Sequence, residues 1–118
     1  MSDPVVEIVA RAGTATTLIN TITVDPAVQD ELVREMVDSV TNIASKAPGF
    51  VSSSLHRSVD GSRVVNYVQW ADEAAWKGAY KHFEDNPDFH HHMAEVHRLA
   101  SPDPHLYEVV AVIEKGTD

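Results

Sequence analysis

Two hydrogen-bond donors share one face of a predicted strand, and together they could hold a ligand. Residues 64–70 read VVNYVQW, and the alternation of a strand places Asn66, Val68 and Trp70 on the same face. That face is otherwise apolar and is expected to lie under the helices, where an amide without partners costs about 1–3 kcal/mol. Either other protein groups or a ligand must satisfy Asn66. With Trp76 one helical turn further on, the amide NH2 and the indole N–H favour a flat, carbonyl-bearing ligand.

The histidines resemble a metal site at first, because His90, His91 and His92 stand in a row. Consecutive residues on a helix point about 100° apart, so three adjacent histidines cannot bind one ion. No further ligand stands at a matching spacing. We therefore expect no metal site, but a solvated helix face on which one histidine can turn inward. His92 or His97 is the candidate to line a pocket and accept a proton.

A histidine on the preceding predicted strand, His56, is the weakest candidate for the pocket. The Asp60-Gly61 dipeptide predicts a two-residue hairpin turn, because both residues tolerate positive φ. This turn would pair Leu55 with Asn66. His56 would then face away from the amide, unless a β-bulge reverses its face.

The elements that position these residues follow a recognisable order. Asp25-Pro26 starts a helix that ends near residue 46, Asp72 caps a second helix, and Asn86-Pro87 starts a third. The predicted helices span residues 26–46, 73–83 and 87–99, and the predicted strands span 16–24, 50–59, 63–71 and 106–114. The order β-α-β-β-α-β, with its second helical region split in two, predicts an α+β ferredoxin-like fold. Such a fold has a four-stranded antiparallel sheet with helices on one face. We place this domain at residues 15–118 and an N-terminal arm at residues 1–14.

The second face of this sheet also needs cover. Residues 109–113 read VVAVI, so apolar side chains lie on both faces of the last predicted strand. Exposed sheet edges and an uncovered apolar face favour sheet-to-sheet pairing, so we expect a homodimer of the dimeric α/β-barrel type. The alternative is that the N-terminal arm covers that face.

Composition narrows the class of partner. The chain has 118 residues, enough for one domain, and its net charge of −9 disfavours nucleic acid and membrane surfaces. It has no cysteine, which excludes thiolate metal sites, iron–sulfur clusters and a cysteine nucleophile. It shows neither a signal peptide nor an apolar run of about 20 residues, so we expect a cytoplasmic protein.

Several motifs resemble the antibiotic biosynthesis monooxygenase family. They are Pro48-Gly49-Phe50, the Asp60-Gly61 turn, Val65-Asn66-Tyr67-x-Gln69-Trp70 and Asp72-Glu73-Ala74-Ala75-Trp76. The resemblance covers residues 17–113. It is nearest to the cofactor-independent members that oxidise anthrones to anthraquinones in aromatic polyketide pathways. It implies a homodimer of ferredoxin-like subunits with a pocket between sheet and helices, and no metal, flavin or haem.

The resemblance also implies roles for individual residues. Asn66 and Trp70 stand where that group contacts its substrate, and Trp76 stands where an aromatic residue, commonly tyrosine, lines the pocket. Because Trp76 has no hydroxyl, a role that needs a phenol is not carried over. An arginine that some members have on the last helix is also absent, since Met93 or its histidine neighbours stand near that position. The remaining candidate substrate-binding residues are Tyr80, Asn20, Phe50, His92, His97 and His56.

The implied chemistry needs little from the protein. An anthrone that loses a benzylic proton becomes a delocalised carbanion, which can pass one electron to O2. The radical pair then recombines to a peroxide, and loss of water leaves the quinone. Asn66 and Trp70 would donate to the carbonyl oxygen as it gains negative charge, and one such donor can contribute about 10²–10³ in rate. The proton acceptor is left open between substrate oxygens, water and a histidine.

Two other classes of function share this scaffold. A haem-degrading oxygenase would use Asn20 and one of the histidines at 90–92, but it also needs a tryptophan where this chain has Ala79-Tyr80. A polyketide cyclase or a small-ligand-binding protein is the third reading, because fold alone does not decide function. The pair of Asn66 and Trp70 favours the oxygenase.

Overall fold

The computed structural model describes residues 16–116, and the predicted order of elements is present within them. The proposed arm at residues 1–14 lies outside this range. The strands are β1 (Thr16–Val24), β2 (Phe50–Arg57), β3 (Arg63–Trp70), β4 (Ala100–Ser101) and β5 (Pro104–Glu108). The helices are α2 (Gln29–Asn42), α3 (Glu73–Phe83) and α4 (Pro87–Leu99). Two short 3-10 turns, η1 (Pro26–Val28) and η2 (Ala44–Lys46), flank α2.

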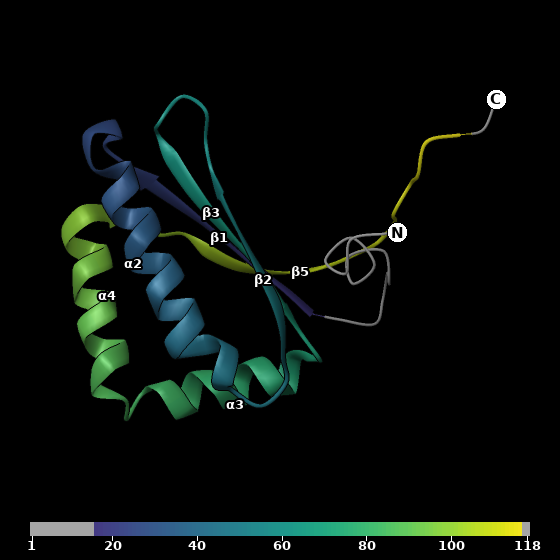
Figure 1. The fold of residues 1–118 in the computed structure, drawn as a ribbon. Coiled ribbons are helices and arrows are strands. Elements are labelled where there is room, and N and C mark those ends of the chain that lie inside the picture. Colours follow the sequence, from purple (N-terminus) through teal and green to yellow (C-terminus); the bar gives the residue numbers. More distant parts are fainter. Residues whose placement is uncertain (1–15, 117–118) are drawn as a thin grey trace.

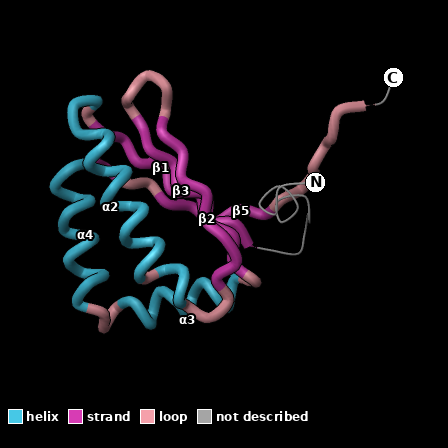
Figure 2. The backbone as a smooth tube through the Cα atoms, viewed as in Figure 1, coloured by secondary structure: helices cyan, strands magenta, loops and turns pink. Residues whose placement is uncertain are grey.

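The sheet is antiparallel and its strand order is β2-β3-β1, with β4 and β5 both paired to the far edge of β1. These two short strands therefore share the fourth position of the sheet. All three helices lie on one face, where α2 and α4 run side by side and α3 crosses near their ends (Figures 1 and 2). The ferredoxin-like α+β prediction is confirmed.

Each helical region begins where a polar side chain accepts free backbone N–H groups. Asp25 Oδ1 accepts from the N–H of residue 27 at 2.9 Å, and Asp72 Oδ1 accepts from that of residue 75 at 2.7 Å. Asn86 Oδ1 accepts from the N–H of Asp88 at 2.9 Å at the start of α4. These caps fix where α3 and α4 begin and so which of their side chains face the sheet.

The β2–β3 hairpin closes with a turn different from the predicted one. Gly61 N–H donates to Ser58 O at 3.1 Å, and Gly61 has a φ of 83°. Asp60 does not have the positive φ that a two-residue Asp-Gly turn requires, so the predicted turn type is wrong. Its carboxylate instead accepts from the Ser62 N–H at 2.9 Å and from the hydroxyls of Ser58 and Ser62. These bonds hold the turn with only glycine in the left-handed region.

The register of the hairpin is the predicted one. Leu55 pairs with Asn66, and His56 lies on the opposite face of the sheet. A β-bulge does occur, but it lies between residues 50 and 52, further from the turn than His56. It therefore reverses the face of Phe50 rather than that of His56, and it places Phe50 opposite Trp70.

The last strand is shorter than expected. The prediction of a strand over residues 106–114 is wrong, because β5 starts at Pro104 and ends at Glu108. Glu108 pairs with Thr16, the first described residue of β1, so the described part of β1 has no partner for residues 109–116. Val110 and Ile113 in this segment are 89% and 91% exposed.

The core between sheet and helices is divided into two apolar clusters. The Val64 cluster consists of Ile22, Val24, Leu32, Met36, Val64 and Val96. The Trp70 cluster consists of Ala47, Val68, Trp70, Ala79 and Phe83. Side chains of α2, α4 and the sheet contribute to the first cluster, whereas α3 contributes only to the second.

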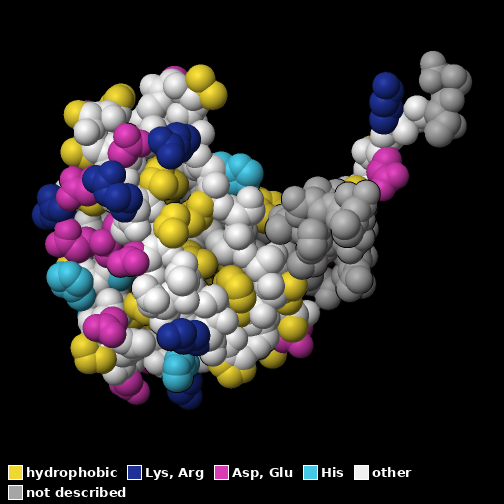
Figure 3. Space-filling view, in the orientation of Figure 1, with side chains coloured by type: hydrophobic (Ala, Val, Ile, Leu, Met, Phe, Trp, Pro, Cys, Tyr) yellow, Lys and Arg dark blue, Asp and Glu magenta, His cyan; other side chains and the backbone are white. Residues whose placement is uncertain are grey.

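The outer surface of the helices is charged. Figure 3 shows basic and acidic side chains intermixed over α2 and α4. Arg57 pairs with Asp30 at 2.7 Å and Arg98 pairs with Glu31 at 2.8 Å, and these side chains are all exposed. Among residues 16–116, no helix has the length and apolarity needed to cross a bilayer.

Candidate active site

Asn66 stands at the boundary between the two apolar clusters. On the helix-facing side of β3, Val64 belongs to one cluster, whereas Val68 and Trp70 belong to the other. Asn66 lies between Val64 and Val68 on that face and is 8% exposed. The prediction that this amide is buried under the helices is confirmed. A buried amide therefore interrupts an otherwise apolar face.

The neighbouring strand repeats this interruption. Leu18 packs against the Trp70 cluster, and Ile22 belongs to the Val64 cluster. Asn20 stands between them on β1 and is the direct partner of Asn66 across the sheet. Its Oδ1 accepts from the backbone N–H of Asp103 at 3.0 Å, which ties β1 to the turn before β5. The two amides thus lie side by side at the same level of the sheet.

One end of the Asn66 amide has a protein partner. Ser53 Oγ donates to Asn66 Oδ1 at 2.5 Å from the adjacent strand β2. Among the described residues, no hydrogen bond from Asn66 Nδ2 is present to match it. The serine therefore meets the amide at its oxygen, on the side of β2. The NH2 group is the end left available to a ligand.

Trp70 carries a second available donor. Its side chain is 3% exposed, and its ring meets that of Phe50 edge to face, with centroids 5.6 Å apart. In the part of the chain that the structure describes, Trp70 Nε1 is the one fully enclosed side-chain nitrogen or oxygen without a hydrogen-bond partner. Such an orphaned donor costs about 1–3 kcal/mol. It is the kind of exception that calls for a specific explanation.

The aromatic candidates gather around Trp70. Phe50 and Trp76 both pack against the Trp70 cluster. Trp76 lies next to Tyr80 on α3, with ring centroids 6.2 Å apart, but Tyr80 is 56% exposed. Phe50 and Trp76 are therefore placed with Trp70, whereas Tyr80 lies at the outer edge of the group.

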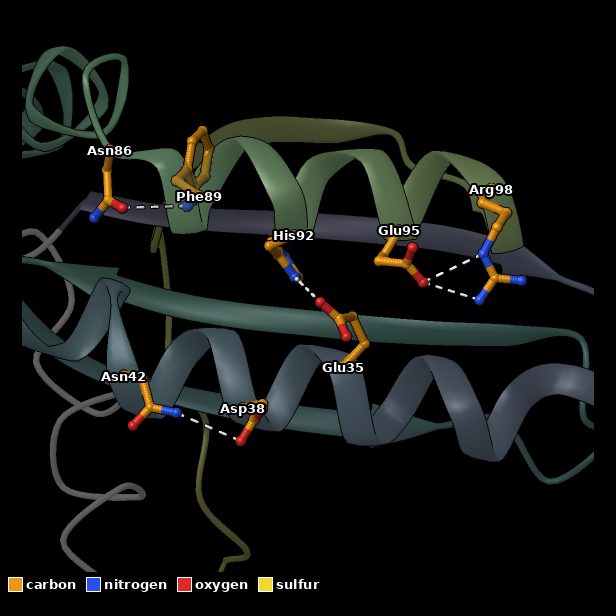
Figure 4. A network of polar contacts seen from close by, with 8 residues as sticks. All are labelled: Glu35, Asp38, Asn42, Asn86, Phe89, His92, Glu95 and Arg98. Atoms are coloured by element: carbon orange, nitrogen blue, oxygen red, sulfur yellow. Dashed lines mark hydrogen bonds and ion pairs between the residues drawn. The ribbon is translucent and has the colours of Figure 1, made fainter.

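Among the histidines, His92 is the one that turns inward, as the sequence led us to expect for one of them. It is 7% exposed, and its Nδ1 lies 3.1 Å from Glu35 Oε1 of α2 (Figure 4). His56 and His97 are exposed, and His56 contacts Ser54 on the far face of the sheet. The structure does not bring these two residues together with Asn66.

Ion pairs surround this contact on the same helices. Arg98 donates to Glu95 at 2.9 Å within α4, as Figure 4 shows. The hydrogen bond from Arg98 lowers the pKa of Glu95, and the bonds to Glu95 and Glu31 raise the pKa of Arg98. Both shifts favour the charged forms of Glu95 and Arg98. Across residues 16–116, no cluster of three or more histidine, aspartate or glutamate side chains is arranged to hold a metal ion.

Two hollows open on the helical side. One runs along α2, and the other, of about 430 Å³, lies between α2 and α4 and is lined by residues that include Glu35, Ile43 and His92. Neither hollow is lined by Asn66 or Trp70. Ile43 lines the second hollow and also packs against the Trp70 cluster.

Sequence reasoning missed Ser53 and Glu35. Ser53 faces the helices because Leu55 pairs with Asn66, so the predicted register already placed a serine diagonally across from the amide. No pattern in the sequence indicated a role for Glu35. Its contact with His92 depends on how α2 packs against α4, which the spacing of residues within one helix does not determine.

The fold is a small α+β domain with Asn66 and Trp70 on the buried face of its sheet, and comparison with known proteins gives its family. Residues 15–95 match the family model described as antibiotic biosynthesis monooxygenase. The chain is 34% identical over 93 residues to tetracenomycin-F1 monooxygenase of Streptomyces glaucescens, which covers 79% of this chain and 80% of that protein. This chain therefore belongs to the antibiotic biosynthesis monooxygenase family.

Solved structures agree with this assignment. A monooxygenase from the ActVA-Orf6 gene of Streptomyces coelicolor, in complex with nanaomycin D, is 27% identical with a TM-score of 0.73. That match covers 87% of this chain and 94% of the other. A variant of SnoaB, a cofactor-independent oxygenase from Streptomyces nogalater, is 23% identical with a TM-score of 0.70, over 87% of this chain and 100% of that one. The second likeness shows the shared fold.

Proposed function

We propose that this protein is a cofactor-independent monooxygenase that oxidises an anthrone-type aromatic polyketide to a quinone with O2. The observation that carries the proposal is the orphaned N–H of Trp70, which lies on the same buried face as the available NH2 of Asn66. One enclosed donor without a partner and one NH2 group without a protein partner among the described residues, on an otherwise apolar face, are suited to a substrate that is flat, apolar and edged with oxygen atoms.

The donors act on charge that develops during the reaction. Loss of a benzylic proton spreads negative charge onto the oxygens conjugated with the anthrone carbanion. Four residues of extended strand put the Cα atoms of Asn66 and Trp70 roughly 13 Å apart, so the donors suit a substrate of several fused rings. Preorganised N–H groups in a dry site stabilise such an anion far better than water does. The aromatic rings of Phe50 and Trp76 provide packing surface for the substrate.

The relatives favour this reaction over the other classes. Tetracenomycin-F1 monooxygenase is a relative at 34% identity, and the ActVA-Orf6 protein is a monooxygenase that binds nanaomycin D. SnoaB is described as a cofactor-independent oxygenase, which supports O2 as the only co-substrate. We therefore assign neither a metal nor an organic cofactor to the site.

We also propose that the working form is a homodimer. Val110 and Ile113 are almost fully exposed, and they follow the last described strand pairing of the sheet. A second subunit would cover such apolar side chains. Sedimentation of the wild type against a chain shortened after residue 108 tests this assignment, because the shortened chain should lose the dimer.

Aerobic turnover of a model anthrone tests the function directly. Protein freed of metal with a chelator should consume one O2 for each anthrone, form the anthraquinone and show no visible absorbance of its own. Because anthrones oxidise slowly in air, the rate is compared with the same solution without protein. A rate no higher than this control contradicts the oxygenase. Activity that needs an added metal or flavin contradicts the cofactor-independent mechanism.

A further inference from the structure

The indole N–H of Trp70 is covered by other side chains, so a ligand meets it only when part of this cover moves. Its Nε1 has no surface open to solvent, and Trp70 lines neither hollow of the helical side. The residues of the Trp70 cluster, and those packed against it, come from the sheet, from the segment after α2, from α4 and from α3. One of these elements must therefore open the way to the indole.

Of the three helices, α3 contributes most to this cover. Ala79 and Phe83 belong to the Trp70 cluster, and Trp76 packs against it. Helix α2 packs against two strands and against α4, whereas the main contact of α3 is with β3. The helix that covers the indole most is thus the one with the fewest neighbours.

The side chains of α3 make only apolar contacts with other elements. Helices α2 and α4 are joined by a bond from Arg98 to Glu31 at 2.8 Å. In the part of the chain that the structure describes, no side chain of α3 has such a bond to another element. Its one ion pair joins Lys77 to Glu73 within the helix. Elements with few stabilising contacts are the first to open locally.

A glycine lies between two of the covering residues. Gly78 stands between Trp76 and Ala79 inside α3. A Cβ at this position would meet no atom of another element within 4 Å, so packing does not require a glycine here. Its φ is not positive either, so the backbone would accept another residue. Because glycine inside a helix is less stable than alanine, Gly78 lowers the free energy needed to open α3 at this point.

The first turn of α3, by contrast, is fixed to the sheet side. The Ala71 N–H donates to Gly49 O at 2.8 Å, just before the helix. Gly49 lies so close to Ala75 that a Cβ at Gly49 would overlap the Ala75 side chain. Asp72 caps the same turn. Opening is therefore expected beyond this turn, where Gly78 stands.

We propose that α3 is a lid over Trp70 and that it opens by local loss of helix at Gly78. The inference rests on the proposed function, because it assumes that a flat aromatic ligand meets the indole N–H. The lid opens to admit the ligand and re-forms over it, so that Trp76 and Ala79 close on the apolar surface of the ligand. Such gating residues set the rate of entry and release without touching the reacting atoms.

Tryptophan fluorescence can follow ligand entry, because Trp70 and Trp76 are the two tryptophans of the chain. Quenching by a dihydroxyanthraquinone is recorded by stopped flow. Gly78→Ala should lower the association and dissociation rate constants about fivefold each, the factor by which a helix favours alanine over glycine. The dissociation constant should stay unchanged, because α3 is closed in both the free and the bound state.

Hydrogen exchange of the backbone amides shows which segment opens. In wild type, the amides of residues 78–83 should exchange faster than those in the middle of α4. Gly78→Ala should slow exchange in α3 about fivefold and leave α4 unchanged. Mass spectrometry of peptides from each helix gives both rates.

Thr41→Ala is the matched control. Thr41 is exposed on α2 and is not part of the Trp70 cluster, and its replacement also raises helix propensity. The variant should bind the quinone with wild-type rate constants and leave exchange in α3 unchanged.

The outcomes separate the lid from the proposed function. If wild type oxidises anthrone while Gly78→Ala binds the quinone with wild-type rate constants, the lid is overturned and the proposed function stands. Equal slowing by Thr41→Ala, or amides of α3 as protected as those of α4, also overturns the lid. If Gly78→Ala shows the expected rates but wild type does not oxidise anthrone, the lid stands and the proposed function is wrong. Absence of any quenching contradicts both.

Discussion

Strand β3 carries two buried amides, and they differ in how much of each the protein satisfies. Gln69 faces away from the helices and is 1% exposed. Its Oε1 accepts from the Thr17 hydroxyl at 3.2 Å, and its Nε2 donates to Tyr67 Oη at 3.1 Å. Asn66 faces the helices and has, within residues 16–116, one side-chain hydrogen-bond partner, Ser53, at its oxygen.

This difference separates a structural amide from an available one. A buried amide with partners at both ends holds neighbouring strands together, and substitution leaves those partners unsatisfied. An amide held only at its oxygen is oriented, yet keeps donor capacity for a ligand. The indole N–H of Trp70 lies on the same face as Asn66, and it too has no hydrogen-bond partner among the described residues, unlike the amide of Gln69. A purely structural role, in which a buried amide holds neighbouring strands together, therefore fits Gln69 better than it fits Asn66.

The largest expected effect follows from Asn66→Ala. Loss of the NH2 donor should lower kcat for anthrone oxidation by about 10²–10³, as for an oxyanion-hole donor. Steady-state O2 uptake measures this effect, and thermal unfolding measures stability in parallel. Asn66→Ala should lose activity while it remains folded. A variant with wild-type kcat would show that the available amide plays no part in the reaction.

Trp70→Phe should reduce activity less. The substitution removes the orphaned N–H and keeps an aromatic ring, so we expect kcat/KM to fall about tenfold or more. The free energy of unfolding should fall by no more than about 1 kcal/mol, because removal of an unpaired buried donor offsets part of the lost packing. Urea unfolding gives the second quantity. A large loss of stability with normal turnover would make Trp70 a packing residue only.

Gln69→Ala should reverse the pattern seen for Asn66→Ala. It leaves the Thr17 and Tyr67 hydroxyls without their amide partner, so the free energy of unfolding should fall by about 1–3 kcal/mol. Activity per folded molecule should remain within a factor of a few of wild type. Urea unfolding and O2 uptake on the same preparation provide both numbers. Equal loss of activity in Asn66→Ala and Gln69→Ala would remove the distinction between the two faces.

The smallest effect concerns the β2–β3 turn, whose geometry sets which residues of the two strands share a face. Hydrogen bonds from the Ser62 hydroxyl and N–H and from the Ser58 hydroxyl lower the pKa of Asp60 to about 2 from 3.8. The ionised form is favoured by folding, so its contribution is complete above pH 3.8 and is lost as pH falls through about 2. Asp60→Asn should therefore unfold at a lower temperature than wild type at pH 6. The gap should close near pH 2, and a gap that is constant with pH would contradict this role.

Much of the fold could be predicted because local signals and global packing agree. The caps at Asp25, Asp72 and Asn86 and the alternation on β3 placed the helices and the buried face of Asn66. The C-terminal end of the last strand could not be predicted, since its apolar residues continue beyond the point where the pairing with β1 ends. The inward turn of His92 is a packing outcome, because three neighbouring histidines have equal propensity and only the contact between α2 and α4 selects one.

The same reasoning explains what the sequence left open about the site. The pairing of Leu55 with Asn66 followed from the turn, but the bulge that brings Phe50 opposite Trp70 has no clear sequence signal. The partner of each amide depends on neighbouring strands, so alternation alone could not tell which of Asn66 and Gln69 is fully satisfied. The roles in binding and catalysis of Asn66, Trp70, Phe50, Trp76 and Asn20 stay predictions.

One measurement tests most directly whether the helix-facing donors meet a ligand. In two-dimensional ¹⁵N NMR, the side-chain NH2 signals of Asn66 and Gln69 and the indole N–H of Trp70 are followed while an anthraquinone is added. We predict that the Asn66 and Trp70 signals shift in a saturable way with a common dissociation constant, while those of Gln69 stay in place. Saturable binding that moves the Gln69 signals and leaves Asn66 and Trp70 unshifted would contradict the account.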